Sequence, residues 1–189
     1  MISAIVAVDK HNGIGNKGDL LFAIPKDMER FIEITNYKTI IMGRKTYDSF
    51  GSEPLPARTN VVITHNEQAI LSNARENLEK LKNDNDDNSF TTLVMSSMET
   101  VKAYITDNIN KQSNEEIIII GGGEIYKELL PYCDTVYLTR YYDHFEADTY
   151  FPNLNKNEWT ASYQSEYKQH KGKRYKFFTY KRTQREIKI

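Results

Sequence analysis

The sequence predicts a single-domain α/β fold with a mixed, mostly parallel central sheet, helices on its faces and an antiparallel hairpin at the carboxyl end. Three observations carry this prediction. Short apolar runs rich in β-branched residues recur along the chain, helical patterns lie between them, and two β-prone segments joined by a polar turn come last. Runs that are apolar almost throughout are typical of strands covered on both faces. We therefore expect parallel strands joined by right-handed helical crossovers.

The predicted parallel strands are the apolar runs at residues 2–8, 39–42, 60–64, 91–95, 116–120 and 134–139. The first run is too short to span a bilayer, and no small-residue cleavage pattern follows it. We therefore expect a buried strand at this position, no membrane association and a cytoplasmic protein.

The first predicted helix begins at Pro25, because proline is favoured at the opening helical position. From Met28 onward, its apolar residues follow the i, i+3, i+4, i+7 spacing of one helical face. Further helices are expected directly after Gly43, at residues 97–107, and from Gly123 to about Leu130, just before Pro131. A proline in that place is expected to end the last of these helices.

The β-prone segments at residues 159–168 and 175–183 predict the final hairpin, with a polar turn at residues 169–174. Residues 66–89 interrupt the alternation of strands and helices, and we expect them to form a surface insertion within one domain that spans residues 1–189. An Asn- and Asp-rich run at 83–89 could bind a divalent cation, but it lacks a Glu at the spacing of a helix–loop–helix calcium site. A solvated turn is the preferred interpretation, and no metal site is expected.

The charge balance argues against polyanionic partners. Lys and Arg number 25 against 26 Asp and Glu, which gives a formal net charge of -1. Such a chain lacks the positive field of a protein that binds nucleic acid or acidic membranes. The single Cys133 cannot form an intramolecular disulfide, so a reducing compartment is expected. Binding must then come from a local site.

Asp27 lies in the first turn of the first predicted helix and shares a face with the apolar Phe31 and Ile34. The other charged residues of this turn are expected on a different face: Lys26, Glu29 and Arg30. A first-turn acid can simply stabilise the positive end of the helix dipole. If Asp27 is buried instead, desolvation raises its pKa, and the carboxyl becomes a candidate hydrogen-bond partner or proton source.

Two predicted strands end in glycine directly before a helix, at residues 40–47 and 117–126. Glycine lets a phosphate approach backbone N–H groups, and the first of these turns adds the cations Arg44 and Lys45. Either turn can also be a plain connection with solvated surface charges. Two such turns at the carboxyl ends of neighbouring strands favour an extended phosphorylated ligand, and a dinucleotide fits that span.

A polar segment at residues 9–19 joins the first strand to the first helix and contains Gly13, Gly15 and Gly18. Such a loop can close over a ligand or can be an ordinary flexible connection. The four histidines are scattered without the spacing of metal ligands, so exposed side chains are expected.

These segments, in this order, resemble the dihydrofolate reductase family along the whole chain apart from residues 66–89. The most specific motifs are Ile41-Met42-Gly43-Arg44-Lys45-Thr46, Pro54-Leu55-Pro56-x-Arg58, Ile120-Gly121-Gly122-Gly123-x-x-Tyr126 and Asp148-Thr149-x-Phe151-Pro152. The resemblance implies a monomeric enzyme that reduces 7,8-dihydrofolate to 5,6,7,8-tetrahydrofolate with NADPH. Hydride would reach C6 and a proton N5, in support of one-carbon metabolism and of thymidylate and purine synthesis.

The resemblance also assigns residues. Asp27 matches the ionisable group of the pterin pocket, with Phe22 nearby as the second catalytic position, and Arg58 matches the arginine that holds the α-carboxylate of the folate glutamate. The remaining implied substrate contacts are Ile5, Ala7, Met28, Phe31, Ile120 and Thr139. The implied cofactor contacts are Ala7, Ile14, Gly15, Gly18, Asp19, Gly43, Arg44, Lys45, Thr46, Thr64, His65, Ser96, Ile120, Gly121, Gly122, Gly123, Glu124, Ile125 and Tyr126.

Two positions depart from the family pattern. The family usually has Leu-Pro-Trp before the first helix, whereas this chain has Leu20-Leu21-Phe22, so the indole N–H that helps to hold an active-site water is missing. Proton delivery is the step that this change puts in doubt. Glu124 stands where some members carry a basic residue near the 2′-phosphate of the cofactor, so a preference for NADPH would rest on Arg44, Lys45 and His65.

Two other interpretations remain open at this stage. The reductase domain of riboflavin synthesis resembles this fold and also uses NADPH, although Asp27 after Pro25 and the segment from Pro54 to Arg58 argue against it. A non-catalytic module that keeps the nucleotide cleft is the alternative from another class. Turnover with dihydrofolate distinguishes the three.

Overall fold

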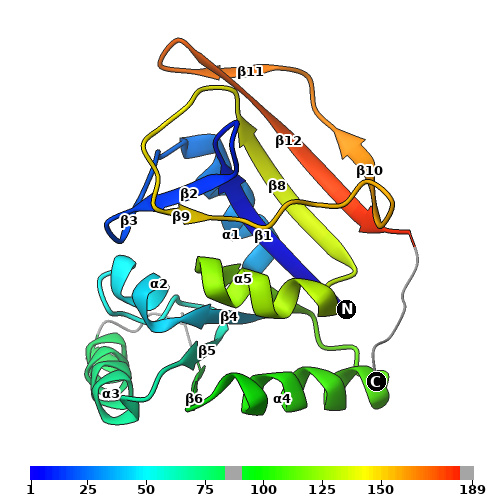
Figure 1. Cartoon of the computed structure of the whole chain (residues 1–189). Coiled ribbons are helices and arrows are strands. Elements are labelled where there is room, and N and C mark those ends of the chain that lie inside the picture. Colours follow the sequence, from blue (N-terminus) through cyan, green and yellow to red (C-terminus); the bar gives the residue numbers. More distant parts are fainter. Residues whose placement is uncertain (84–90, 184–189) are drawn as a thin grey trace.

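The computed structural model describes residues 1–83 and 91–183. They form one nine-stranded sheet with helices packed around it (Figure 1). The strands follow the order β10 (Trp159–Gln164), β12 (Lys173–Arg182), β8 (Thr135–Tyr141), β1 (Ile2–Val8), β7 (Ile117–Gly121), β4 (Thr39–Gly43), β5 (Thr59–Ile63) and β6 (Thr91–Met95), with β11 (Lys168–His170) paired to β12. From β8 to β6 all neighbours are parallel, whereas β12 is antiparallel to β8, β10 and β11. The predicted mixed, mostly parallel sheet with a final hairpin is confirmed.

The helices that connect the strands are α1 (Pro25–Thr35), α2 (Arg44–Ser49), α3 (Glu67–Asn83), α4 (Met98–Asn110) and α5 (Gly123–Leu129). All but α3 were predicted as helices. Pro25 opens α1, as expected, and the Ser97 hydroxyl caps α4 by accepting the Thr100 amide N–H at 3.2 Å. The helix α5 ends at Leu129, before Pro131 as expected, and a 3₁₀ turn, η1 (Leu130–Tyr132), follows it, because proline suits the first positions of a new helical turn. None of the helices in the described part of the chain has the length and apolar character needed to span a bilayer.

The central strands are buried on both faces because alternate side chains belong to different core clusters. In β4, Ile40 and Met42 pack with α1, α2 and α3, whereas Ile41 packs on the other face with α4 and α5. Figure 1 shows α5 in front of the central strands and α1 behind them. The near-continuous apolar runs of the sequence are therefore explained by helices on both faces.

The segment that we expect to be an insertion contains α3, which contributes to the core. Ile70 and Ala74 are 3% and 5% exposed, and Ile70 belongs to the cluster that packs against β4 and β5. This part of the segment is therefore a helix that packs on the sheet. The Asn- and Asp-rich run lies outside the described residues from position 84 onward.

The polar segment after β1 is more ordered than a plain loop. Strands β2 (Gly13–Asn16) and β3 (Asp19–Leu20) form a hairpin, and β2 also pairs with β9 (Thr149–Tyr150) in a second, three-stranded sheet. Asp9 fixes the base of this hairpin because its carboxylate, 1% exposed, accepts the backbone N–H groups of Gly13 at 2.7 Å and Phe145 at 3.1 Å. Burial raises the pKa of Asp9, but the hydrogen bonds that its carboxylate accepts lower the pKa by more. The pKa of Asp9 therefore lies below its usual value.

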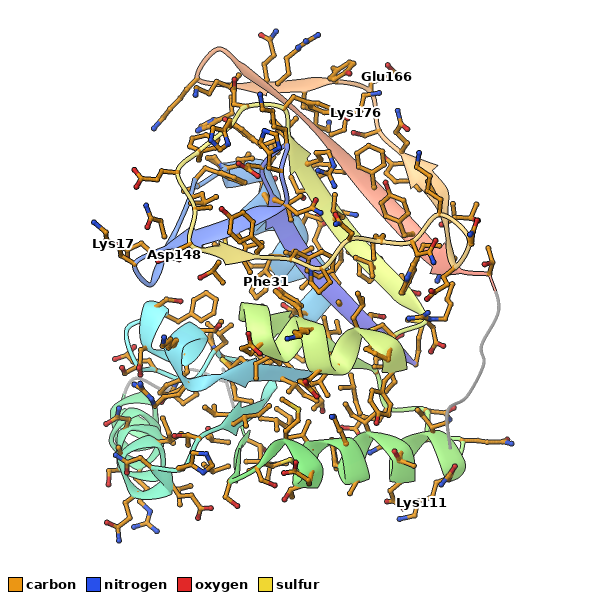
Figure 2. The ribbon with its side chains drawn as sticks, viewed as in Figure 1. Lys17, Phe31, Lys111, Asp148, Glu166 and Lys176 are labelled. Atoms are coloured by element: carbon orange, nitrogen blue, oxygen red, sulfur yellow. The ribbon has the colours of Figure 1, made fainter. Side chains whose placement is uncertain are left out.

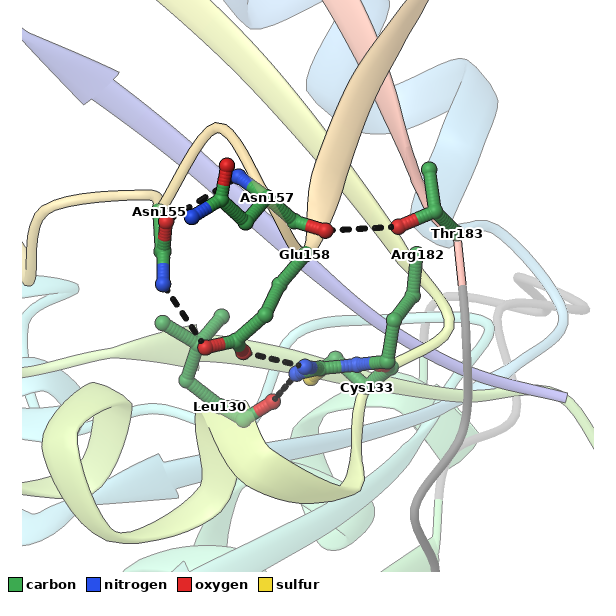
Figure 3. A network of polar contacts seen from close by, with 7 residues as sticks. All are labelled: Leu130, Cys133, Asn155, Asn157, Glu158, Arg182 and Thr183. Atoms are coloured by element: carbon green, nitrogen blue, oxygen red, sulfur yellow. Dashed lines mark hydrogen bonds and ion pairs between the residues drawn. The ribbon is translucent and has the colours of Figure 1, made fainter.

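The end of β12 is attached to the 3₁₀ turn by one arginine (Figure 3). Arg182 donates from Nε to the carbonyl of Cys133 and from Nη2 to the carbonyl of Leu130, both at 2.9 Å, and from Nη1 to the Glu158 carboxylate at 2.9 Å. The guanidinium also covers the Trp159 ring, 4.3 Å from its centroid. These contacts fix the antiparallel edge of the sheet to its parallel part.

We expect Ile41→Ala to lower the free energy of unfolding by about 2–5 kcal/mol, because Ile41 is fully buried between the sheet and α4 and α5, and the substitution leaves a cavity. Denaturant titration followed by circular dichroism measures the change. Ile32→Ala is the matched control, since Ile32 is 48% exposed on α1 and its loss should cost less than about 1 kcal/mol. Equal losses in the two variants would contradict the assigned core.

Candidate active site

A cleft of about 2020 Å³ opens where the parallel strands β4, β5 and β7 end. Its walls are α1, the glycine-rich turns that follow β4 and β7, the β2–β3 hairpin and the segment around β9. In a parallel sheet the strand ends present free backbone groups and helix starts on one side, which is why ligands of α/β proteins bind there. The cleft is therefore the candidate functional site.

Asp27 reaches this cleft from the first turn of α1. Its carboxylate accepts a hydrogen bond from the hydroxyl of Thr139, a residue of β8 that is 1% exposed. Phe31, one helical turn later, lines the same cleft, as the shared helical face predicts. Burial raises the pKa of Asp27, whereas the hydrogen bond from Thr139 and the nearby charge of Arg30 lower it, and the pKa stays above its usual value.

The expectation that Arg30 lies away from Asp27 is wrong. Its guanidinium donates from Nη2 to the Phe178 carbonyl at 2.9 Å and from Nη1 to the Thr139 hydroxyl at 3.4 Å. Residues three apart are neighbours on a helix, and the long arginine side chain extends from that position toward β8 and β12. Asp27 therefore has a cationic neighbour, which sequence reasoning had placed on another face.

The turn after β7 brings backbone into the cleft. Gly121 has φ +131°, which a residue with a side chain rarely adopts, and a Cβ added there would lie 3.2 Å from the Thr46 hydroxyl. A Cβ on Gly123 would lie 2.9 Å from the Thr149 methyl group. The Tyr126 hydroxyl donates to the Ile5 carbonyl at 2.6 Å and ties α5 to β1. This turn therefore requires glycine, and the missing side chains leave backbone N–H groups accessible.

Cationic and polar side chains surround the outer part of the cleft. Arg44 and Lys45 are exposed at the start of α2, and Arg44 pairs with Asp48 at 2.5 Å. His65 is exposed just after β5, and Thr64 before it is buried. Glu124 is exposed at the start of α5 and brings a negative charge to the same region. Because exposed ion pairs such as Arg44–Asp48 are weak, Arg44 stays available to a phosphate.

The β2–β3 hairpin lies over one side of the cleft. Figure 2 shows Phe31 near the middle of the molecule, whereas Lys17 and Asp148 lie together at its edge. The Lys17 amide N–H donates to the Asp148 carboxylate at 2.8 Å. Since Asp148 directly precedes β9, this bond attaches the hairpin to that strand. Backbone pairing and this contact position the hairpin beside the cleft.

Arg58 lies beside the cleft and is buried, with 7% of its surface exposed. Nε donates to the Thr35 hydroxyl at 2.9 Å, and Nη1 donates to the Pro56 carbonyl at 2.5 Å. Its Cζ lies 5.9 Å from the centroid of the Phe31 ring. Nη2 has no hydrogen-bond partner among the residues that the structure describes, and burial lowers the pKa of the guanidinium. The charged group is thus held in place with donors still available.

Phe22 forms part of the cleft wall and stacks on Tyr141, with 4.6 Å between ring centroids. Tyr141 continues the contact to Tyr175, 6.1 Å away, and Tyr175 to Phe177, 5.5 Å away. Arg30 then covers Phe177 at 4.8 Å. A row of aromatic rings therefore leads from the cleft wall to Arg30, and Phe22, its member in the cleft wall, cannot donate a hydrogen bond.

The structure brings most of the predicted site residues into this one cleft. Those that line it are Ile5, Ala7, Ile14, Gly15, Gly18, Asp19, Phe22, Asp27, Met28, Phe31, Gly43, Arg44, Lys45, Thr46, Thr64, His65, Ile120, Gly121, Gly122, Gly123, Glu124, Ile125 and Tyr126. Three lie outside the lining: Arg58, Thr139 and Ser96. Thr139 contacts Asp27 from behind, and Ser96 is exposed after β6.

Sequence reasoning missed several lining residues, including Phe50, His170, Lys171 and the segment 148–152. The Asp148-Thr149-x-Phe151-Pro152 motif was a signal for the last of these, since it follows the family pattern, although no role was assigned to it. No pattern in the sequence indicates His170 and Lys171, which the tip of the final hairpin carries to the cleft. Among the side chains of residues 1–75 and 91–183, no three His, Cys, Asp or Glu gather as a metal ion would require.

A doubly covered parallel sheet whose glycine-ended strands open on a cleft with one partly buried carboxyl is typical of nucleotide-dependent α/β enzymes. The family model described as dihydrofolate reductase matches residues 1–182. The chain belongs to the dihydrofolate reductase family.

Individual relatives agree with this assignment. The chain is 33% identical over 160 residues to a dihydrofolate reductase of Bacillus subtilis, covering 84% of this chain and 80% of the relative. It is 33% identical over 165 residues to a dihydrofolate reductase of Haemophilus influenzae, covering 85% and 84%. Among solved structures, a dihydrofolate reductase of Enterococcus faecalis complexed with NADP(H) and RAB-propyl superposes with a TM-score of 0.75 at 30% identity, covering 97% of each chain.

We expect Asp27→Asn to stabilise the free protein at pH 7 by about 1 kcal/mol. The pKa of Asp27 is raised in the folded state above its ordinary value of 3.8, so keeping the ionised carboxyl buried destabilises the fold. This penalty is complete above the raised folded-state pKa and disappears as the pH falls to about 3.8, because the carboxyl is then protonated in both states.

Thermal unfolding of wild type and Asp27→Asn across this pH range measures the difference. The matched control is Asp107→Asn, in which an exposed carboxylate of α4 is replaced, and its effect should not follow this pattern. A difference between wild type and Asp27→Asn that stays constant with pH would contradict the raised pKa.

Proposed function

We propose that the cleft is the active site at which this protein reduces 7,8-dihydrofolate to 5,6,7,8-tetrahydrofolate. When bound, NADPH supplies the hydride that C6 of the substrate receives, while N5 takes up a proton. The observation that carries the proposal is the partly buried Asp27 carboxyl in a cleft whose other end is lined by glycine turns and cations. Membership of the family over residues 1–182 supports the same reaction. The tetrahydrofolate serves one-carbon metabolism and the synthesis of thymidylate and purines.

Asp27 anchors the pterin. A carboxylate at the floor of an apolar cleft binds a heterocycle that offers neighbouring N–H groups, because each carboxylate oxygen can accept a hydrogen bond. Thr139 occupies one lone pair of Oδ1 and leaves Oδ2 to the ligand. The apolar contacts around the ring come from Ile5, Met28, Phe31 and Ile120. Asp27 therefore fixes the orientation of the ring.

Phe22 narrows the cleft without supplying a hydrogen bond. The proton for N5 then comes from a water held by Asp27 and the backbone, since Phe22 has no group that can donate or accept a hydrogen bond. Hydrogen bonding through a single ordered water costs little in free energy, so the missing indole does not exclude turnover. The β2–β3 hairpin excludes bulk water from this part of the cleft.

Arg58 holds the glutamate end of the substrate. Its guanidinium is fixed beside Phe31 by the bonds of Nε to Thr35 and of Nη1 to Pro56, and neither bond uses Nη2. An arginine that is positioned in advance binds a carboxylate with little loss of side-chain entropy. The pterin ring and the glutamate would thus contact opposite ends of α1.

The residues around the β4 and β7 turns fit the cofactor. The glycines at 121–123 leave room that a Cβ on Gly123 would fill against Thr149, so a phosphate can approach the backbone. Arg44, Lys45 and Thr46 supply charge and a hydroxyl next to this turn, and Thr64 and His65 extend the polar surface toward the adenosine end. Ala7, Ile14 and Ile120 are apolar groups in the lining suited to the nicotinamide.

The protein acts as a cytoplasmic monomer with no nucleic-acid or membrane partner. The near-neutral charge of -1 supports the absence of polyanionic partners. Cys133, the single cysteine of the chain, is buried, which is consistent with a reducing compartment. A single chain carries every residue that the mechanism uses.

The assay of the purified protein with NADPH and dihydrofolate tests the reaction, because oxidation of the cofactor is followed by its absorbance. We expect turnover in the wild type and a loss on the order of 100-fold in kcat at neutral pH in Asp27→Asn, with NADPH binding retained. Asp107→Asn on the exposed part of α4 is the matched control and should keep wild-type turnover. Wild-type turnover in Asp27→Asn would remove Asp27 from the mechanism.

Replacement of Arg58 by Leu should raise KM for dihydrofolate by about 10- to 100-fold, since a charge-assisted hydrogen-bonded pair is lost. A pterin substrate without the glutamate tail is the control, because its KM should hardly change. Steady-state kinetics with both substrates gives the comparison. An equal rise for both substrates would mean that Arg58 acts on the fold or on the ring and not on the glutamate.

A further inference from the structure

The side of Asp27 that faces away from the cleft contains a chain of hydrogen bonds that ends in a cation. Thr139 donates its hydroxyl hydrogen to Asp27 and accepts from Nη1 of Arg30 at 3.4 Å. A guanidinium can only donate, so the oxygen of Thr139 must accept from Arg30, and its single hydrogen is directed to the carboxylate. The chain therefore favours Asp27 as an acceptor, which is its ionised form.

Arg30 is built into this position. Nη2 donates to the carbonyl of Phe178 at 2.9 Å, and the guanidinium lies 4.8 Å from the centroid of Phe177 and 5.8 Å from that of Tyr137. A planar cation held between two rings and a carbonyl cannot swing into solvent without losing these contacts. Arginine keeps its charge even when burial lowers its pKa, as it does here.

We propose that Arg30 is a positioning residue that keeps Asp27 ionised and hydrogen-bonded at neutral pH, acting through Thr139 from behind the cleft. This inference rests on the proposed role of Asp27 in binding the pterin. Burial alone would favour the neutral acid, in which one oxygen carries a hydrogen and becomes a donor, so the carboxyl is a poorer acceptor for the ring and for Thr139. Arg30 opposes that effect without touching the ligand, because it is not part of the cleft lining.

The other titratable groups around Asp27 do not provide this charge. Tyr126 and Tyr175 face it from α5 and β12, and burial raises the pKa of each, so both stay neutral at pH 7. On α1 itself, Lys26 and Glu29 pair with each other at 2.6 Å with more than half of each side chain exposed. His170 and Lys171 line the cleft from the final hairpin, on the ligand side of the carboxyl. Arg30 is therefore the cation that faces Asp27 from behind.

The test is a titration of the Asp27 side-chain carboxyl carbon by NMR in the ligand-free protein, with Asp27→Asn identifying the resonance. In Arg30→Gln the midpoint should rise by about one pH unit or more, because an opposite charge nearby is lost. Arg30→Lys should restore most of the wild-type midpoint. Lys26→Gln is the matched control. It removes an exposed cation from the same helical turn as Asp27 and should leave the midpoint unchanged.

An unchanged midpoint in Arg30→Gln, or an equal rise in Lys26→Gln, would overturn the inference. Because Arg30→Gln also removes the contact to Phe178 and can unfold the protein, the wild type provides a second measurement. The Nη resonances of Arg30 should titrate with the midpoint of Asp27, and this inflection should vanish in Asp27→Asn. Its absence in the wild type would equally overturn the inference.

These measurements do not depend on catalysis. A shifted midpoint in a protein without dihydrofolate turnover would refute the proposed function and leave the coupling of Arg30 to Asp27 standing as a structural property only. Turnover with an unshifted midpoint would refute the role of Arg30 and leave the proposed function intact. The two proposals therefore fail in distinguishable ways.

Discussion

The hydrogen bond between Thr139 and Asp27 is the contact on which the candidate active site depends. It joins β8 to the first turn of α1 across 112 positions of sequence and fixes the carboxyl at the floor of the cleft. A carboxyl in apolar surroundings is unstable as an anion unless it is hydrogen-bonded or paired with a cation. Thr139 and Arg30 supply both, so the fold can keep there a group that would otherwise be neutral.

The rest of the cleft is formed by the turns at the ends of the parallel strands. Their carboxyl ends meet along one side of the sheet, so two turns that are distant in sequence, after β4 and after β7, become neighbours. Thr46 of α2 accordingly lies where a Cβ on Gly121 would almost touch its hydroxyl. The Tyr126 hydroxyl, bonded to the Ile5 carbonyl, then fixes α5 relative to β1, which supplies the inner wall. The common direction of the parallel strands thus places the cationic turns and the carboxyl of Asp27 in the same cleft.

The sequence predicted the order and type of the elements well because the strands are covered on both faces, and unbroken apolar runs such as residues 117–120 then follow directly from burial. Strand ends and glycines are local signals and indicated the two turns of the cleft, whereas most of its other residues were assigned through the resemblance to the family. The sequence did not predict the pairing of β2 with β9 or the position of Arg30, because both depend on contacts between distant segments. The direction of a long side chain is set by tertiary packing, and no periodicity encodes it.

Phe22 in the cleft wall and Arg30 behind the cleft are connected by the aromatic row through Tyr141, Tyr175 and Phe177. Phe22 offers no hydrogen bond to water, so the cleft floor is more apolar than one with an indole N–H, and an apolar floor raises the pKa of Asp27. A cation behind the carboxyl lowers that pKa again without adding a polar group to the surface that faces the ligand. The cleft can thus be dry where it contacts the pterin and still hold an ionised carboxylate, with the balance set outside the binding surface.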